Sequence, residues 1–191
     1  MKLRGFDPDT IENERSRLER FEAGLGLIPI ITAAFNGVTL GDGVGLTHAQ
    51  GLDDYADEAT CARYRDSDEK EDWTRISFES LCHCNSSLSF FDAEGMRFHL
   101  PAYLVADLRK EYGYGMAFCL SHRYPGSDDR FSLLSTEQRI AVRLFLLHIL
   151  NDPDYEFDRP HLKRSLDEYW VLPVESPTQP KGEQVSAPND R

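Results

Sequence analysis

The predicted fold depends on the stretch LSFFDAEGMRFHL, residues 88–100. Two apolar runs flank Asp92-Ala93-Glu94-Gly95 in this stretch. Asp is favoured at the first position of a type I turn, and Gly at the fourth supplies the positive φ of the bulge that closes a hairpin. Apolar residues alternate on both sides of the turn, as they do on one face of a strand pair: Leu88, Phe90, Met96, Phe98 and Leu100. We therefore predict a β-hairpin at about residues 88–100.

Helix signals surround this stretch on both sides. Asp7-Pro8-Asp9 predicts a charged N-terminal helix, and Pro101 can take the first position of another helix. Ser135 and Gln138 have capping-box spacing at the start of an apolar helix over residues 135–150, which we expect to lie in the middle of the fold. The sequence thus predicts a predominantly helical α+β fold, with roughly five or six helices and one hairpin.

Length and composition indicate one globular domain. The chain has 191 residues, of which 40% are hydrophobic and 28% charged, and a chain of this size can bury a core without disulfides or metal. We assign residues 28–172 to this domain and residues 1–27 to the charged N-terminal helix. Residues 173–191 are rich in Pro, Ser, Gln, Glu and Lys, so we predict a disordered tail there.

The charge balance narrows the class of partner. The chain carries 33 acidic and 21 basic residues, a formal net charge of -12. Nucleic-acid binding depends on Lys and Arg neutralising phosphates, so the sequence argues against a nucleic-acid partner and against an anionic membrane surface. The N-terminus lacks the apolar segment of a signal peptide, and no apolar stretch reaches the ~20 residues that cross a bilayer. We expect a cytoplasmic protein.

The most acidic segment is residues 53–72, with nine acidic and three basic residues. Such a segment can bind a basic protein partner and accelerate its association. The candidate partner-binding residues are its carboxylates Asp53, Asp54, Asp57, Glu58, Asp66, Asp68, Glu69 and Asp72.

An alternative hypothesis places a catalytic site at the predicted hairpin. Asp92, Arg97 and His99 lie within eight residues and could act in acid–base chemistry. A structural interpretation is also available, because Asp92 would cap the turn and Arg97 could stack on Phe91. We expect the structural roles to dominate.

The four cysteines suggest neither a metal site nor a nucleophile. Structural zinc sites usually space their cysteines by two to four residues, and Cys82-His83-Cys84 would need Cys61, Cys119 or His122 to converge on it. Cys119 and His122 lack an evident third group to orient them. We read Cys61, Cys82, Cys84 and Cys119 as reduced thiols and predict no metal and no cofactor.

The motif LSFFDAEGMRFHLPAYL, residues 88–104, resembles the defining motif of a family of small bacterial proteins of unknown function. Four further segments are similar to that family: Ala33-Ala34-Phe35, Asp54-Tyr55, Trp73-x-x-Ile76 and Gln138-x-x-Ala141-Val142. The resemblance covers roughly residues 28–170. It implies a bacterial source and one compact domain, and it transfers no activity to any residue.

Two functional hypotheses follow from the sequence. The first is a non-catalytic binding protein of the immunity or antitoxin type, whose acidic surface covers a basic partner such as a toxin. The second is an enzyme of unknown reaction that acts through Asp92, Arg97 and His99.

Overall fold

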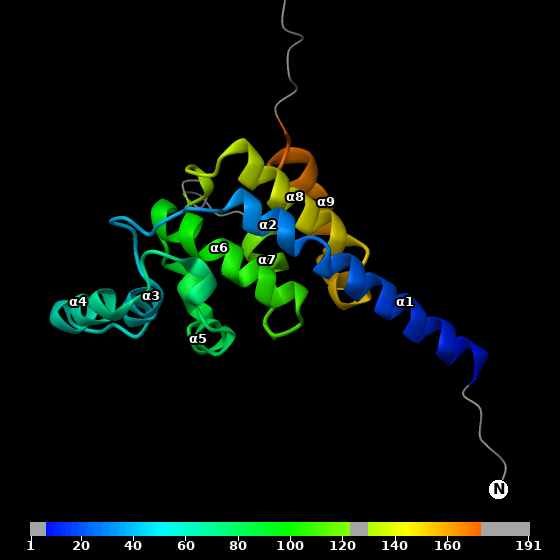
Figure 1. The fold of residues 1–191 in the computed structure, drawn as a ribbon, viewed down its shortest axis with the longest axis horizontal. Helices are drawn as coiled ribbons and strands as arrows, with labels where there is room; N and C mark the ends of the chain where they lie inside the picture. The colour runs from blue at the N-terminus through cyan, green and yellow to red at the C-terminus, as the bar shows by residue number, and fades with distance from the viewer. Residues whose placement is uncertain (1–6, 123–129, 173–191) are drawn as a thin grey trace, which may run out of the picture.

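The computed structural model describes residues 7–122 and 130–172, and this part of the chain contains helices and no strand (Figure 1). The α-helices are α1 (Pro8–Leu25), α2 (Ile28–Ala34), α3 (Leu46–Asp53), α4 (Glu58–Ser67), α5 (Phe78–His83), α6 (Ala93–Leu108), α7 (Ala117–Ser121), α8 (Thr136–Leu150) and α9 (Arg159–Glu168). The 3₁₀ helices include η1 (Trp73–Arg75), η2 (Asn85–Ser89) and η4 (Pro153–Asp158). The predicted α+β class is therefore wrong. The predicted tail, residues 173–191, lies outside the described residues.

The predicted hairpin is a helix start. Residues 85–89 form η2, and α6 begins at Ala93. Asp92 is the N-cap of α6, since its Oδ1 accepts a hydrogen bond from the backbone N–H of Gly95 at 2.8 Å. Asp is a preferred N-cap as well as a preferred first turn residue, so one residue pattern fits both structures.

Gly95 has a different role from the predicted one. It lies inside α6 and is absent from the residues with positive φ. A Cβ at this position would clash with the carbonyl oxygen of Val44, which approaches the first turn of α6. The backbone N–H of Val44 also donates to Asp92 Oδ1 at 3.0 Å. Gly95 is therefore needed for close contact between two backbone segments and does not close a turn.

Helix α6 forms the centre of the fold. Thirteen of its 16 residues are buried, whereas α8 keeps an exposed face that includes Leu147, 40% exposed. The prediction that the helix over residues 135–150 is central is therefore wrong. A helix that is buried on all sides is apolar all round, so the strand-like alternation of Met96, Phe98 and Leu100 carried no information about its period. The prediction that Pro101 begins a helix is also wrong, because Pro101 lies inside α6.

The start of α8 was predicted correctly. The Ser135 Oγ accepts a hydrogen bond from the N–H of Gln138 at 3.2 Å, and the Gln138 side chain accepts one from the N–H of Ser135 at 3.0 Å. This reciprocal pair satisfies two backbone donors that a helix start leaves unpaired. Helix α2 packs against both α6 and α8.

Two buried tryptophan side chains form hydrogen bonds with backbone carbonyl groups that are distant in the sequence. The Trp73 Nε1–H donates to the Phe35 carbonyl at 3.1 Å, and the Trp170 Nε1–H donates to the Leu120 carbonyl at 3.0 Å. Both rings are buried, so each hydrogen bond satisfies a donor that burial removes from water.

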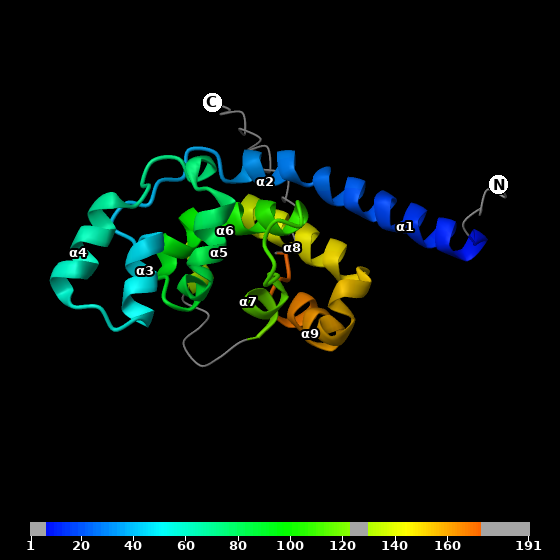
Figure 2. The same cartoon turned by 90° about the horizontal axis from the view of Figure 1, so that it is seen from below.

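The molecule is elongated, with helix α4 at one end and α1 at the other (Figures 1 and 2). Helix α4 packs on α3. Helix α1 extends away from the other helices, and Gly24 is its one buried residue. A Cβ at Gly24 would lie 2.7 Å from His148 Nε2, so this glycine lets the end of α1 pack on α8. Among the described residues, no helix is long and apolar enough to cross a membrane.

Candidate functional site

Asp92 and His99 of the predicted catalytic group have structural roles. Asp92 caps α6, as described above. The His99 ring is fully buried and stacks on Phe91, with ring centroids 4.4 Å apart and an interplanar angle of 4°. Its Nδ1 lies 2.7 Å from the Gly95 carbonyl oxygen and therefore carries the proton, because a carbonyl can only accept. Burial lowers the pKa of His99 to about 4, which keeps the ring neutral.

Arg97, the third predicted member, is half-buried on α6. Its Nε is buried and has no hydrogen-bond partner within the described residues, and the same holds for Nε2 of His99. The ring that stacks on Phe91 is that of His99. The geometry thus explains Asp92 and His99 through helix capping and core packing.

Several carboxylates of the acidic segment are used as helix caps. Asp57 caps α4 by accepting from the N–H of Thr60 at 2.7 Å, and this backbone bond lowers the pKa of Asp57. Asp72 caps η1 by accepting from Thr74, whose hydroxyl lies 2.7 Å away and lowers the pKa of Asp72. The Glu69 Oε1 accepts three backbone N–H groups, of which that of Glu71 lowers its pKa most. These three carboxylates therefore stabilise the local structure of the acidic segment.

Asp68 caps a helix that lies elsewhere in the sequence. Its carboxylate accepts from the N–H of Thr47 at 2.8 Å, from the Thr47 hydroxyl at 2.8 Å and from the N–H of His48 at 3.1 Å. These N–H groups belong to the first turn of α3, so the carboxylate after α4 satisfies the start of α3. A Cβ at Gly45 would clash with the Asp68 carboxylate. Neutralising Asp68 would therefore weaken the packing of α3 against α4.

The remaining predicted residues gather at the turn between α3 and α4. We call residues 53–58, Asp-Asp-Tyr-Ala-Asp-Glu, the acidic turn: it holds four carboxylates and no basic residue. Asp54, Asp57 and Glu58 are exposed and Asp53 is half-buried. Asp66 is exposed on α4. The turn lies at the end of the molecule opposite α1 (Figure 2).

Tyr55, in the middle of the acidic turn, lies in a segment that resembles the family but was not among the predicted partner-binding residues. Its side chain is 96% exposed, and its φ of 56° lies in the left-handed region. The N–H of Tyr55 bonds to the Leu52 carbonyl and that of Ala56 to the Gly51 carbonyl, which is the Schellman ending of a helix. Glycine is the usual residue at this position, and a tyrosine there is strained.

Lys110 occupies the same position at the end of α6. Its φ is 58°, its N–H bonds to the Asp107 carbonyl, and the next N–H bonds to the Ala106 carbonyl. Here the side chain explains why glycine is absent. Lys110 Nζ lies 2.8 Å from Asp152 Oδ2 and 3.2 Å from Asp154 Oδ2. Partial burial opposes its charge, but the hydrogen bonds to these carboxylates outweigh that effect and raise the pKa of Lys110.

A buried carboxylate lies beside this lysine. Asp107 is 4% exposed; the Tyr155 hydroxyl donates to its carboxylate at 2.8 Å and the Met116 N–H at 3.3 Å. Burial raises the pKa of Asp107 to about 6, although both hydrogen bonds oppose the shift. Buried titratable groups with shifted pKa values are concentrated at functional sites. No sequence pattern indicates this group, because Asp107 lies in an apolar helix and its partner Tyr155 is 48 residues away.

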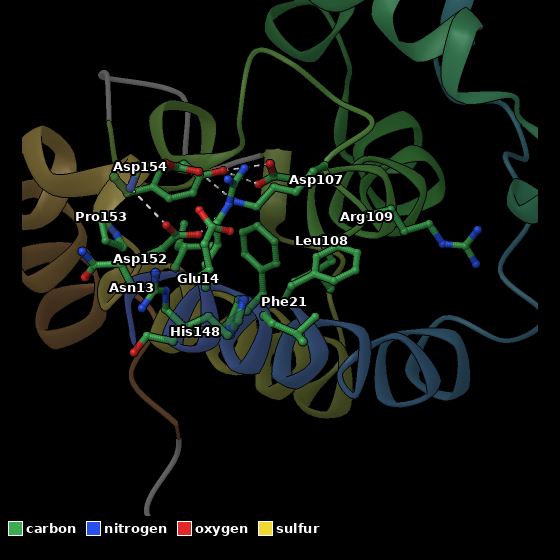
Figure 3. A pocket seen from close by; sticks show the side chains of 18 residues that line it. Asn13, Glu14, Phe21, Asp107, Leu108, Arg109, His148, Asp152, Pro153 and Asp154 are labelled. Atoms are coloured by element: carbon green, nitrogen blue, oxygen red, sulfur yellow. Dashed lines mark hydrogen bonds and ion pairs between the residues drawn. The ribbon is translucent and has the colours of Figure 1, made fainter. Parts of the chain in front are cut away.

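A cleft of about 1170 Å³ opens between α1 and this cluster (Figure 3). Helix α1 forms one wall with Glu14, Arg17 and Arg20. The ends of α6 and α8 and the start of η4 form the other wall, with Asp107, Lys110, His148, Asp152 and Asp154. Burial lowers the pKa of His148.

The cysteines are free thiols. Burial raises the pKa of Cys84 and of Cys119 to about 11, so both are protonated at neutral pH and are poor nucleophiles. Within residues 7–122 and 130–172, no three His, Cys, Asp or Glu side chains are placed to hold a metal ion.

A family model described as "Family of unknown function (DUF6714)" matches residues 25–173. The chain belongs to this family. No curated protein and no solved structure matches the chain. The family region contains the acidic turn and the buried Asp107, whereas nearly all of α1, including Arg17 and Arg20, precedes it.

Proposed function

We propose that this protein is a non-catalytic binding domain whose acidic turn, residues 53–58, binds a basic protein partner. The observation that carries the proposal is Tyr55. Lys110 and Tyr55 both stand where glycine is usual at a Schellman helix ending, but among the described residues only the Lys110 side chain has hydrogen-bond or ion-pair partners. A strained and almost fully exposed tyrosine is explained if its partner lies in another molecule.

The chemistry of the turn suits basic side chains. Tyrosine rings attract Lys and Arg by cation–π interaction, and Tyr is enriched among the residues that dominate binding energy. Asp53, Asp54 and Glu58 can form charge-assisted hydrogen bonds with the same guanidinium or ammonium groups. None of these three carboxylates accepts a backbone N–H at a helix start among the described residues, and Asp54 accepts one side-chain hydrogen bond, from Gln50 at 3.1 Å, so each can accept more from a partner.

The rest of the acidic segment also favours a basic partner, because its negative charge creates an electrostatic field that attracts one. The segment 53–72 contributes a net charge of -6, and the capping carboxylates still carry their charge. Such a field increases the rate at which a basic protein associates. Nuclease-like toxins are basic because they bind phosphates, so an immunity or antitoxin role fits this chemistry.

The test compares three variants. Tyr55→Gly removes the ring and the backbone strain together, and Asp53→Asn with Asp54→Asn and Glu58→Gln removes charges that cap no helix. Phe157→Ala is the matched control, because Phe157 is 93% exposed on η4, outside the acidic turn. Affinity capture from the native host with the wild-type chain supplies the partner, and association and dissociation rates are then measured across a salt series.

We expect a basic partner whose affinity falls at least about fivefold with Tyr55→Gly, since a central interface tyrosine commonly contributes more than ~1 kcal/mol. The triple variant should slow association at low salt and matter less near 1 M salt, where the Debye length falls to about 3 Å. Phe157→Ala should bind like the wild type. An acidic partner, or a basic one that binds all variants equally, would refute the proposal.

A further inference from the structure

The cleft between α1 and the body of the protein has walls of opposite charge. On α1, Arg17 and Arg20 outnumber Glu14. On the opposite wall, Asp107, Asp152 and Asp154 outnumber Lys110, with Arg109 at its edge. The two walls therefore differ in sign while the cleft as a whole carries little net charge.

The floor of the cleft is apolar. Phe21 of α1, Leu108 of α6, and Phe145 and Ile149 of α8 line it. Figure 3 shows Phe21 and Leu108 in the same part of the cleft, away from the carboxylates of Asp152 and Asp154. Small-molecule sites commonly combine such an apolar surface with a few polar groups that fix orientation.

Both walls retain unused binding capacity. Arg17 has no hydrogen bond or ion pair within the described residues. The Asp154 side chain is 73% exposed, and within residues 7–122 and 130–172 its carboxylate forms an ion pair with Lys110 alone. Each carboxylate can accept about four hydrogen bonds, so Asp154 and Asp107 can both accept more than they do.

We propose that this cleft binds a small zwitterion with an ammonium group, a carboxylate and an apolar side chain, such as an amino acid or a short peptide. The carboxylate would bind Arg17 and Arg20, because guanidinium groups recognise carboxylates through paired hydrogen bonds. The ammonium group would bind Asp154 and Asp107, and the apolar side chain would pack on Phe21 and Leu108.

The opposed walls exclude simpler ligands. A plain anion would meet three carboxylates on the far wall, and a plain cation would meet two arginines on α1. Either ligand would leave one wall desolvated without a partner, which costs affinity. The cleft volume of about 1170 Å³ exceeds the ~300–1000 Å³ of common ligand sites, so a short peptide fits as well as a free amino acid.

The experiment is isothermal titration calorimetry on the full chain with four probes. L-leucine and leucyl-leucine carry all three groups and separate the free amino acid from the peptide. N-acetyl-leucine lacks the ammonium group, and leucinamide lacks the carboxylate. The wild type should bind leucine or leucyl-leucine at least tenfold more tightly than either blocked probe.

Two variants test which wall of the cleft binds which group of the ligand. Arg17→Gln should abolish the preference over leucinamide and keep the preference over N-acetyl-leucine, whereas Asp154→Asn should do the reverse. Arg15→Gln is the control, because Arg15 pairs with Glu12 on α1 and does not line the cleft. Circular dichroism checks that each variant folds. Absence of binding by the zwitterionic probes at 10 mM, or binding to which Arg17 and Asp154 are both indifferent, would overturn the proposal.

Discussion

Two buried titratable groups of α6, Asp107 and His99, should change stability in opposite directions as pH falls from 7 to 4. Burial raises the pKa of Asp107 from 3.8 to about 6, so the folded state holds this proton more tightly than the unfolded state. Protonation of Asp107 then stabilises the fold, fully below pH 3.8, and this contribution is lost as pH rises through 6. Burial lowers the pKa of His99 from 6.5 to about 4. Its contribution is present above pH 6.5 and is lost as pH falls towards 4.

The magnitudes follow from these pKa values. With 1.36 kcal/mol per pKa unit, Asp107 should contribute about 2 kcal/mol of added stability between pH 7 and pH 4. His99 should remove about 3 kcal/mol over the same range. Because the two contributions nearly cancel in the wild type, neither is visible until one group is removed.

Urea unfolding of the wild type, Asp107→Asn and His99→Asn at several pH values between 7 and 4 measures both effects. Relative to the wild type, Asp107→Asn should lose about 2 kcal/mol as pH falls, and His99→Asn should gain about 3 kcal/mol. Asp66→Asn, which alters an exposed carboxylate on α4, is the control for general charge effects. Curves for Asp107→Asn and His99→Asn that both run parallel to the wild type would refute the assignment of buried, shifted pKa values.

Two further predictions test local structure. Gly95→Ala should destabilise the fold by ~1–3 kcal/mol, because the added Cβ clashes with the Val44 carbonyl oxygen; Glu94→Gln should cost no more than ~1 kcal/mol of helix-dipole energy, and equal melting temperatures for the two variants would contradict the contact. Ser135→Ala should cost about 1 kcal/mol by removing the N-cap of α8. Denaturant unfolding measures this loss, and an unchanged midpoint would show that the cap contributes nothing.

Helix starts could be predicted from the sequence where a polar N-cap residue precedes the helix. Asp7-Pro8 and Ser135 with Gln138 mark the starts of α1 and α8, and the structure confirms both starts. The same kind of signal was misread at Asp92, because Asp and Gly fit a hairpin turn as well as an N-cap and a close backbone contact. The spacing of apolar residues could not decide between a hairpin and a helix, because α6 is apolar on nearly every side.

The candidate functional residues could likewise be predicted from the sequence only in part. The high density of carboxylates in the sequence located the acidic segment. It could not show that Asp68 caps α3, which lies 20 residues earlier, whereas Asp53 and Glu58 cap no helix start in the described part of the chain. That distinction depends on which backbone N–H groups a carboxylate meets in three dimensions. Asp107 and Arg17 were missed for a similar reason, because the cleft between them is made by packing α1 against segments more than 80 residues later.

Tyr55 and Lys110 both have a strained left-handed backbone, but the fold explains this strain only for Lys110. Each occupies a left-handed helix ending at which glycine relieves roughly 1–2 kcal/mol of strain and costs about 0.5–1 kcal/mol of backbone entropy. Lys110→Gly would also remove the ion pairs to Asp152 and Asp154, so the lysine is accounted for by the fold. Tyr55→Gly removes no contact within the described residues and should raise stability slightly. The exposed, strained tyrosine among four carboxylates therefore supports the proposed contact between the acidic turn and a basic partner, and a stability gain for Tyr55→Gly without a loss of binding would argue against it.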